Sequence, residues 1–347
     1  MSGDEVVSTE EVPQAWMERR NKVESITENL KSNLLTDPGV QYISITRDEN
    51  KEIDDKNGLL PKIWTYNDKN TDLPKKAGSI PVKKGGEKKF EQTGCSQTDV
   101  DDGDCRVNKE DIKDSFGGGE RVCSSSGCGT LTCEIYDQVT DDWQLLTCCH
   151  LFEDYCTSNL VGDGLWYNGN KIGEVLRYDE DADFAVVDTS ANNYGTDSGI
   201  DMEERGKDFY VGECEKVVGH ATKSAIASMC SDSENVYKMV SATDTTVGSI
   251  NDYSADGDNG IGCNTLENEA IFTNIDNTHG DSGGPMFAKS RYYNAIILGI
   301  HQQGANDWDI WDDACNLRYG FLGEYILGER FKTFLLLFHI WLRSNQE

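Results

Sequence analysis

Residues 278–285 read THGDSGGP, and three glycines bracket the single serine of this stretch, Ser282. A serine that presents its hydroxyl at the tip of a tight turn needs neighbours that can adopt positive φ angles and expose their backbone N–H groups, as glycine does. The backbone N–H groups of Gly280 and Ser282 are then candidate donors for an oxyanion hole. A glycine-rich hairpin turn with an incidental serine is the plainer interpretation of this stretch taken alone.

A histidine is the next requirement, because a serine hydroxyl is a weak nucleophile until a neighbouring base accepts its proton. His150 ends the apolar run 145–149, which predicts a strand that delivers the imidazole to a cleft at its end. A buried structural histidine is the alternative for this residue alone. His150 is therefore the candidate general base.

The base in turn requires a carboxylate that fixes its tautomer and stabilises the imidazolium. Asp183 opens the apolar run 184–187, so we expect its side chain at the edge of the core, whereas Asp179 and Asp181 lie in an acidic loop. A solvated turn aspartate is common in so acidic a chain. Only the conjunction with a histidine and a serine favours Asp183 as the orienting carboxylate.

The chain order His150, Asp183, Ser282 resembles that of the trypsin-like serine peptidases of the chymotrypsin clan, in their bacterial and archaeal form. The motifs similar to those of the family are LLTCCH (145–150), DFAVVD (183–188) and GDSGGP (280–285). The resemblance covers residues 117–330 and implies an all-β fold of two antiparallel six-stranded β-barrels with the triad between them. It also implies a serine endopeptidase that forms an acyl-enzyme and needs no cofactor.

A substrate pocket is a further implication of the resemblance. The run LGIHQQG at 298–304 is similar to the strand that lines the family's substrate cleft, which makes Gln302, Gln303 and Gly304 expected pocket residues. Asp276 precedes Ser282 by the offset at which members with Lys/Arg specificity place their pocket aspartate. A carboxylate in a desolvated pocket pairs strongly with a basic side chain, although one inserted residue would turn Asp276 to solvent.

Twelve cysteines form an even set, which favours several disulfides and an extracellular or cell-surface location. Residues 1–36 contain no apolar segment of a secretory signal, so a cytoplasmic location stays open. By the same family resemblance, Cys214 and Cys230 bracket a stretch that a disulfide brackets in some bacterial members. The adjacent Cys148 and Cys149 stand where the family usually has small residues, and they cannot easily bond to each other.

Two other functions compete with peptidase activity. A zinc site would draw on a cluster of soft ligands, although the cluster contains no C-x-x-C pair. Its members are Cys123, Cys128, Cys133, Cys148, Cys149 and His150. A catalytically silent homologue kept as a binding module is the other candidate, but the sequence shows no lesion in the triad or the oxyanion hole.

Charge is unevenly distributed along the chain, whose formal net charge is −30. Residues 1–90 carry 15 Lys/Arg and 16 Asp/Glu, whereas residues 91–347 carry 17 and 46. Such acidity repels nucleic acid and anionic lipid, so neither is an expected partner, whereas the resemblance to serine peptidases implies polypeptide substrates. Because molar salt screens dense carboxylates, the composition suggests a halophilic, haloarchaeal source, with an ordinary acidic extracellular protein as the alternative.

Four segments are predicted along the chain. Residues 1–92 form a small α+β module, either a propeptide or an accessory domain, with a helix over 12–34 and β-rich runs at 40–45, 61–66 and 80–83. Residues 93–116 form a polar linker, 117–330 the peptidase domain and 331–347 a C-terminal helix. The apolar run 334–342 is too short to span a bilayer as a helix, although a short interfacial anchor remains an alternative.

The body alternates short apolar runs with turn residues, and no helical pattern intervenes. The expected strands are 129–136, 143–147, 171–177, 183–187, 209–218, 236–240, 270–275 and 295–301.

Overall fold

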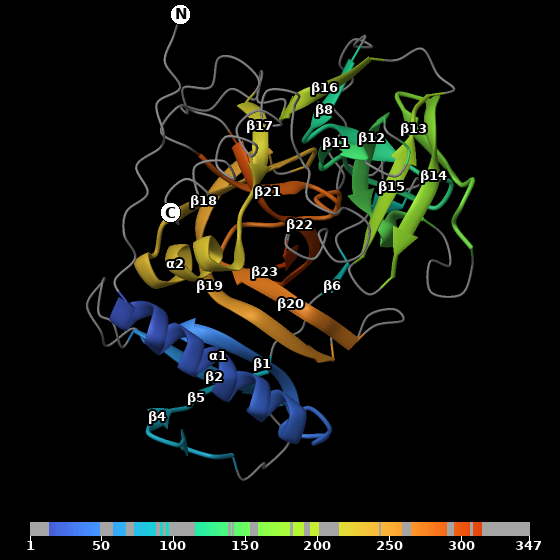
Figure 1. The fold of residues 1–347 in the computed structure, drawn as a ribbon. Coiled ribbons are helices and arrows are strands. Elements are labelled where there is room, and N and C mark those ends of the chain that lie inside the picture. The colour runs from blue at the N-terminus through green and yellow to red at the C-terminus, as the bar shows by residue number, and fades with distance from the viewer. Residues whose placement is uncertain are drawn as a thin grey trace, which may run out of the picture.

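The protein is described here by a computed structural model in which strands dominate (Figure 1). The described residues are 14–48, 58–66, 73–87, 91–92, 95–96, 115–137, 140, 142–152, 159–180, 183–190, 195–200, 215–242, 244–258, 265–289, 295–305 and 308–313. The predicted C-terminal helix over 331–347, Cys214, and most of the predicted linker lie outside these residues.

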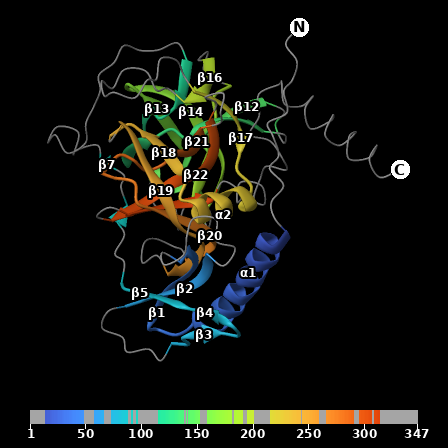
Figure 2. The same ribbon diagram turned by 90° about the vertical axis from the view of Figure 1, so that its left-hand side faces the viewer.

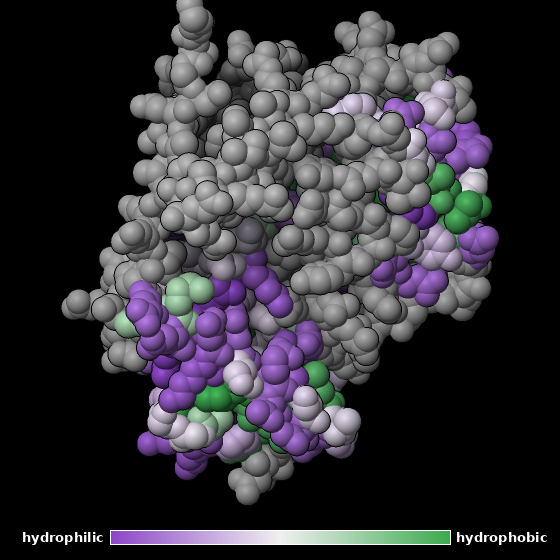
Figure 3. Space-filling model, in the orientation of Figure 1, coloured by the Kyte–Doolittle hydropathy of each residue, from purple (hydrophilic) through white to green (hydrophobic). Residues whose placement is uncertain are grey.

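The N-terminal module contains the predicted helix and strands. Helix α1 (Gln14–Leu34) packs on a small sheet, because Leu30 on one face of the helix joins Ile43 and Ile63 in a buried cluster. The strands of the module are β1 (Val40–Arg47), β2 (Leu59–Thr65), β3 (Lys76–Ala77), β4 (Ile80–Pro81) and β5 (Lys83–Gly85). Figure 3 shows that the visible described surface of the module is mainly hydrophilic.

One sheet of the body carries the predicted histidine and aspartate. Among the described residues it has eight strands in the order β11-β12-β15-β14-β13-β9-β10-β7. Their bounds are β7 (Cys95–Ser96), β9 (Arg121–Cys123), β10 (Gly127–Thr130), β11 (Cys133–Asp137), β12 (Asp142–Cys148), β13 (Gly164–Tyr167), β14 (Asn170–Asp179) and β15 (Phe184–Asp188).

The other large sheet carries the predicted serine and also takes in the module, because β1 pairs with β19. Within it the pairings of β18 to β23 return on themselves in the order β19-β18-β21-β22-β23-β20-β19. These strands are β18 (Asn235–Val240), β19 (Asp244–Asp258), β20 (Thr265–Thr273), β21 (Pro285–Lys289), β22 (Ala295–Ala305) and β23 (Trp308–Asp313). The remaining members are β6 (Glu91–Gln92), β8 (Ser115–Gly118), β16 (Gly195–Ile200) and β17 (Glu215–His220).

Two features differ from the expected body. The eight-stranded sheet follows an open path, so two closed six-stranded barrels are not seen among the described residues. The body also contains a helix, α2 (Lys223–Asp232), where no helical pattern was expected. The Thr222 side chain caps this helix by accepting a hydrogen bond from the Ala225 N–H, and Ile226, Ala227 and Cys230 bury one face of it.

The two views in Figures 1 and 2 agree that the module lies at one end of the molecule, against β19 and β20. Helix α1 covers one side of its sheet. Within the described part of the chain, no helix combines the length and the hydropathy needed to cross a membrane.

Candidate active site

His150 and Asp183 form a direct pair at the ends of two neighbouring strands of the eight-stranded sheet. His150 lies in a short 3-10 turn, η2 (Cys149–Leu151), that directly follows β12, and Asp183 directly precedes β15, the strand beside β12. Asp183 Oδ2 lies 2.5 Å from His150 Nδ1, and the two side chains are 4% and 2% exposed. The carboxylate therefore holds the Nδ1 side of the imidazole ring, which is the arrangement a base-orienting aspartate requires.

The backbone around Asp183 fixes this geometry from several directions. Asp183 Oδ1 accepts a hydrogen bond from the His150 N–H at 2.8 Å, and its carbonyl accepts one from the Cys149 N–H at 3.0 Å. Its φ angle of 44° is in the left-handed region, which a non-glycine residue adopts at some cost and aspartate tolerates better than most. These contacts together fix the direction in which the Asp183 carboxylate points.

The basicity of the imidazole reflects two opposed effects. Burial alone would lower the pKa of His150, but the charge of Asp183, the nearby Cys148 and their hydrogen bonds raise this pKa well above its usual value. Cys148 Sγ lies 3.8 Å from His150 Nε2, the other ring nitrogen. The site thus favours the imidazolium, the species that forms when a base takes a proton.

Ser282 lies in the serine loop, which we define as residues 274–284, and it is completely buried. The Ser282 carbonyl accepts a hydrogen bond from the Thr130 N–H at 2.7 Å, and the Gly280 carbonyl accepts one from the Thr130 hydroxyl at 2.8 Å. Gly280 has a φ of 99°, in the left-handed region that glycine adopts readily. Strand β10 of the eight-stranded sheet therefore holds the serine loop, which belongs to the other large sheet.

Gly283 brings the serine and histidine segments into contact. Its φ is 84°, and a Cβ atom built on it would lie 2.4 Å from the Thr130 carbonyl oxygen and 2.5 Å from Thr147 Oγ1. The same Cβ atom would lie 3.1 Å from the Cys148 backbone nitrogen. Because Cys148 is two residues before His150 and Gly283 directly follows Ser282, this close approach places the two segments side by side.

Lys238 is a site residue that sequence analysis missed. Its ammonium lies 2.8 Å from Asp281 Oδ2, with both side chains 0% exposed, and it also donates to the Asp276 carbonyl. The same carboxylate oxygen accepts a hydrogen bond from the Thr278 N–H at 2.9 Å. The strand β18 thus clamps the serine loop through a fully buried ion pair next to Ser282.

The predicted pocket residues differ in burial and in contacts. Gln302 is buried, and Gly304 lies against Asn277, whose Oδ1 would be 2.0 Å from a Cβ atom at that glycine. Nothing is described of the Gln303 side chain. Asp276 is exposed, so the desolvation that would strengthen its pairing with a basic substrate residue is absent here. Specificity for Lys or Arg stays a prediction.

The structure contradicts the predicted Cys214–Cys230 disulfide and weakens the zinc alternative. The predicted Cys214–Cys230 disulfide is wrong, because Cys230 is a buried free thiol that donates to the Asn251 carbonyl at 3.6 Å. Cys123 and Cys128 form a disulfide instead, which removes two thiolates from the zinc alternative. Cys148 and Cys149 are not bonded to each other, and both are free thiols. No group of three or more potential metal ligands occurs among the described residues.

Comparison with solved structures finds bacterial serine proteases at low sequence identity and with TM-scores below 0.5. The sequence matches no family model, and no curated protein matches it. Thermobifida fusca protease A is 15% identical, with a TM-score of 0.44 over 59% of this chain and 95% of its own. A Nocardiopsis protease is 15% identical, with a TM-score of 0.46 over 60% and 96%. A Cellulomonas bogoriensis chymotrypsin is 14% identical, with a TM-score of 0.43 over 59% and 94%. Function is therefore inferred from the residues of the site itself.

Proposed function

We propose that the chain is a trypsin-like serine endopeptidase with His150, Asp183 and Ser282 as its catalytic triad. The observation that carries the proposal is the buried contact between His150 Nδ1 and Asp183 Oδ2, 2.5 Å long, on a segment that abuts the residue after Ser282. An aspartate on Nδ1 leaves Nε2 as the nitrogen that can accept a serine proton.

The chemistry follows from these positions. His150 takes the proton of the Ser282 hydroxyl while its oxygen attacks the carbonyl carbon of the scissile peptide, and the backbone N–H groups of Gly280 and Ser282 stabilise the oxyanion. His150 then passes the proton to the leaving amine, and an acyl-enzyme forms. Water, deprotonated by His150, hydrolyses the ester and restores the serine.

The catalytically silent alternative is separated from this proposal by a covalent probe. A fluorophosphonate reacts only with an activated serine, so we expect stoichiometric labelling that Ser282→Ala abolishes. Removing a triad member from related enzymes lowers kcat by roughly 10⁴-fold to 10⁶-fold. The Ser282→Ala variant should keep the parent melting temperature, because the side chain removed is small and lies in a loop. Labelling that survives in this variant would place the nucleophile elsewhere.

Substrate and location follow as further parts of the proposal. The substrates are polypeptides, and Asp276 remains the candidate for a preference for Lys or Arg before the cleaved bond. The Cys123–Cys128 disulfide supports an oxidising, extracellular compartment. The acidity of residues 91–347 supports a halophilic source.

A further inference from the structure

A free thiol lies beside the nitrogen of His150 that the proposed mechanism uses. Cys148 ends strand β12, and its Sγ lies 3.8 Å from His150 Nε2. Cys148 is 0% exposed, and the His150 side chain is 2% exposed. The thiol and the imidazole are therefore held next to each other, at the ring nitrogen opposite to the one that Asp183 contacts.

The spacing of these two atoms suits a shared metal ion. Zinc binds a thiolate sulfur at about 2.3 Å and an imidazole nitrogen at about 2.0–2.1 Å. Two such bonds that meet at an angle of about 110–120° place the sulfur and the nitrogen roughly 3.6–3.8 Å apart. The observed distance of 3.8 Å is at the upper end of this range, so one ion can reach both atoms.

Asp183 supplies the outer contact that a metal-binding histidine needs. Such a histidine usually donates its other ring N–H to a carboxylate, which fixes the tautomer and makes the ring a better ligand. Asp183 Oδ2 makes this contact at Nδ1, and Asp183 Oδ1 is fixed in turn by the His150 backbone N–H. The arrangement that prepares Nε2 to accept a proton therefore also prepares it to bind a cation.

The chemistry of the pair selects a soft or borderline divalent cation. Thiolate and imidazole ligands suit zinc, whereas calcium and magnesium require oxygen ligands. As the ion binds, the Cys148 thiol loses its proton to water and coordinates as a thiolate, and neutral His150 coordinates through the Nε2 lone pair. No atom is oxidised or reduced. Because no third Cys, His, Asp or Glu joins the pair among the described residues, water fills the other positions and binding is reversible.

We propose that Cys148 Sγ and His150 Nε2 form a binding site for zinc-like divalent cations, and that occupation of this site inhibits the peptidase. An ion on Nε2 takes the lone pair that would otherwise accept the proton of Ser282, so the serine is not activated. The inhibitory part rests on the proposed function. Metal binding by the pair does not, because it requires only the two ligands at their observed spacing.

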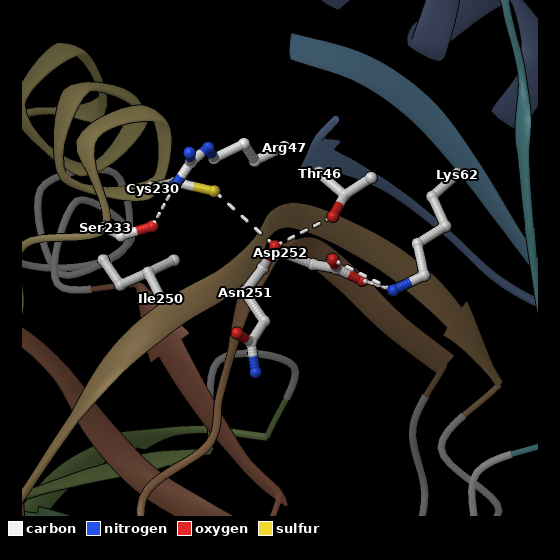
Figure 4. Close-up of a pocket in the computed structure, with 8 residues that line it drawn as sticks. All are labelled: Thr46, Arg47, Lys62, Cys230, Ser233, Ile250, Asn251 and Asp252. Atoms are coloured by element: carbon white, nitrogen blue, oxygen red, sulfur yellow. Dashed lines mark hydrogen bonds and ion pairs between the residues drawn. The ribbon is translucent and has the colours of Figure 1, made fainter. Parts of the chain in front are cut away.

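Cys230 provides a matched control thiol. It is also buried and free, and it lines a cavity of about 280 Å³ between the N-terminal module and the body, which Figure 4 shows. Its thiol donates to the Asn251 carbonyl, and none of the eight described residues that line the cavity is a histidine. Arg47 and Lys62 line the same cavity, and their positive charges repel a metal cation. Cys230 therefore has room for an ion beside it but no imidazole ligand.

Metal binding is measured first in the full-length Ser282→Ala chain, where no catalysis interferes. Cadmium chloride is the probe, because a cadmium–thiolate bond adds an ultraviolet charge-transfer band that can be titrated. We expect Cys148→Ala to weaken the tightest cadmium binding by more than about tenfold, since loss of even an outer-shell partner costs this much. The isosteric Cys148→Ser should do the same, and Cys230→Ala should leave the affinity unchanged. Melting temperatures show that each variant is folded.

Fluorophosphonate labelling in the presence of zinc chloride tests the inhibitory part in chains that retain Ser282. Zinc should slow labelling, and prior addition of a chelator should prevent this effect. Relative to the metal-free rate of each chain, the half-inhibitory zinc concentration should rise more than about tenfold in Cys148→Ala and Cys148→Ser. It should stay at the parent value in Cys230→Ala.

The two measurements separate this inference from the proposed function. A parent chain that is never labelled defeats the peptidase proposal, whereas loss of cadmium affinity in the Cys148 variants alone still supports the metal site. Equal cadmium affinities in the Cys148 and Cys230 variants would overturn the inference. Equal sensitivity of their labelling to zinc would overturn its inhibitory part.

Discussion

Gly283 has room for no side chain at all. Because its φ is positive and a Cβ atom would overlap the Thr130 carbonyl oxygen, Gly283→Ala combines backbone strain with a steric clash. Gly162 is a matched control, since its φ is 96° and a Cβ atom there meets nothing within 4 Å. We expect Gly162→Ala to cost about 1–2 kcal/mol of unfolding free energy and Gly283→Ala roughly twice as much. Denaturant melts of both variants measure the difference, and equal costs would contradict the close approach.

The raised pKa of His150 predicts how the proposed peptidase activity depends on pH. Burial opposes this rise, but Asp183 and Cys148 outweigh it, so the base becomes neutral only above the usual histidine range. Peptidase activity should therefore increase with pH through a pKa above about 6.5. Cys148→Ala removes one of the raising contributions and should move the acid limb of the kcat/KM profile to lower pH. Cys133→Ala, at another buried free thiol, should leave the profile in place.

The same shift has a signed effect on stability. A group whose pKa is higher in the folded state stabilises the fold fully below its unfolded pKa of about 6.5. That contribution is lost as the pH rises through the folded pKa. Unfolding free energies measured across this window should fall toward alkaline pH in the parent, and Asp183→Asn should flatten the curve. A curve that rises with pH would assign the opposite shift to His150.

Strand β18 acts on the serine loop through Lys238, which makes this lysine a positioning residue. Lys238→Met leaves Asp281 buried without its ion-pair partner, a change that costs about 3–5 kcal/mol. The loop also loses its clamp, so we expect slower fluorophosphonate labelling and a lower kcat with a smaller change in KM. The double variant Lys238→Met/Asp281→Leu should regain much of the stability but not the labelling rate. Recovery of both would reduce the pair to a structural role.

An exposed ion pair provides the control for this experiment. Lys171 and Glu174 lie 2.6 Å apart, but their side chains are 41% and 58% exposed. Lys171→Met should change the unfolding free energy by less than about 1 kcal/mol and leave labelling unchanged.

Local sequence patterns predicted the strands around the site better than they predicted the buried residues that hold the site in place. The apolar runs before His150 and after Asp183 are strands, and both residues lie at strand ends as expected. Lys238 could not be found in this way, because its partner is 43 residues away and no spacing links them. The Cys230 pairing failed for a related reason: the helix that carries Cys230 turns its side chain into the core.

The arrangement of strands into sheets was also beyond the sequence patterns. Short strands with polar turns indicate a barrel or a sandwich, but they do not say which strand edges remain unpaired. The addition of β1 to β19 is accompanied by a long-range contact between Lys62 of β2 and buried Asp252 of β19, and neither leaves a periodic signal in the sequence. The expected strands were largely right, whereas closure of both barrels was not seen in the part of the chain that the structure describes.

The whole molecule carries a net charge of −30, and most of the excess acid is in residues 91–347. Like charges at this density repel one another in dilute buffer, and molar salt shortens the Debye length to about 3 Å. We therefore expect the melting temperature to rise by several degrees between 0.1 M and 3 M NaCl. The control is the same titration with an uncharged osmolyte of matched osmolality. A flat response to NaCl would remove the halophilic interpretation.

The rate at which each buried free thiol reacts with an alkylating reagent would report how often the fold opens around it. Burial raises the pKa of Cys133, Cys149 and Cys230, so their thiolates are scarce while the fold is closed. Cys133 lies in β11 and Cys149 in the turn that follows β12, whereas Cys230 lines a cavity together with Thr46 and Lys62 of the N-terminal module. The order in which an alkylating reagent modifies these three cysteines would show which part of the protein opens first, without any added dye or engineered tag.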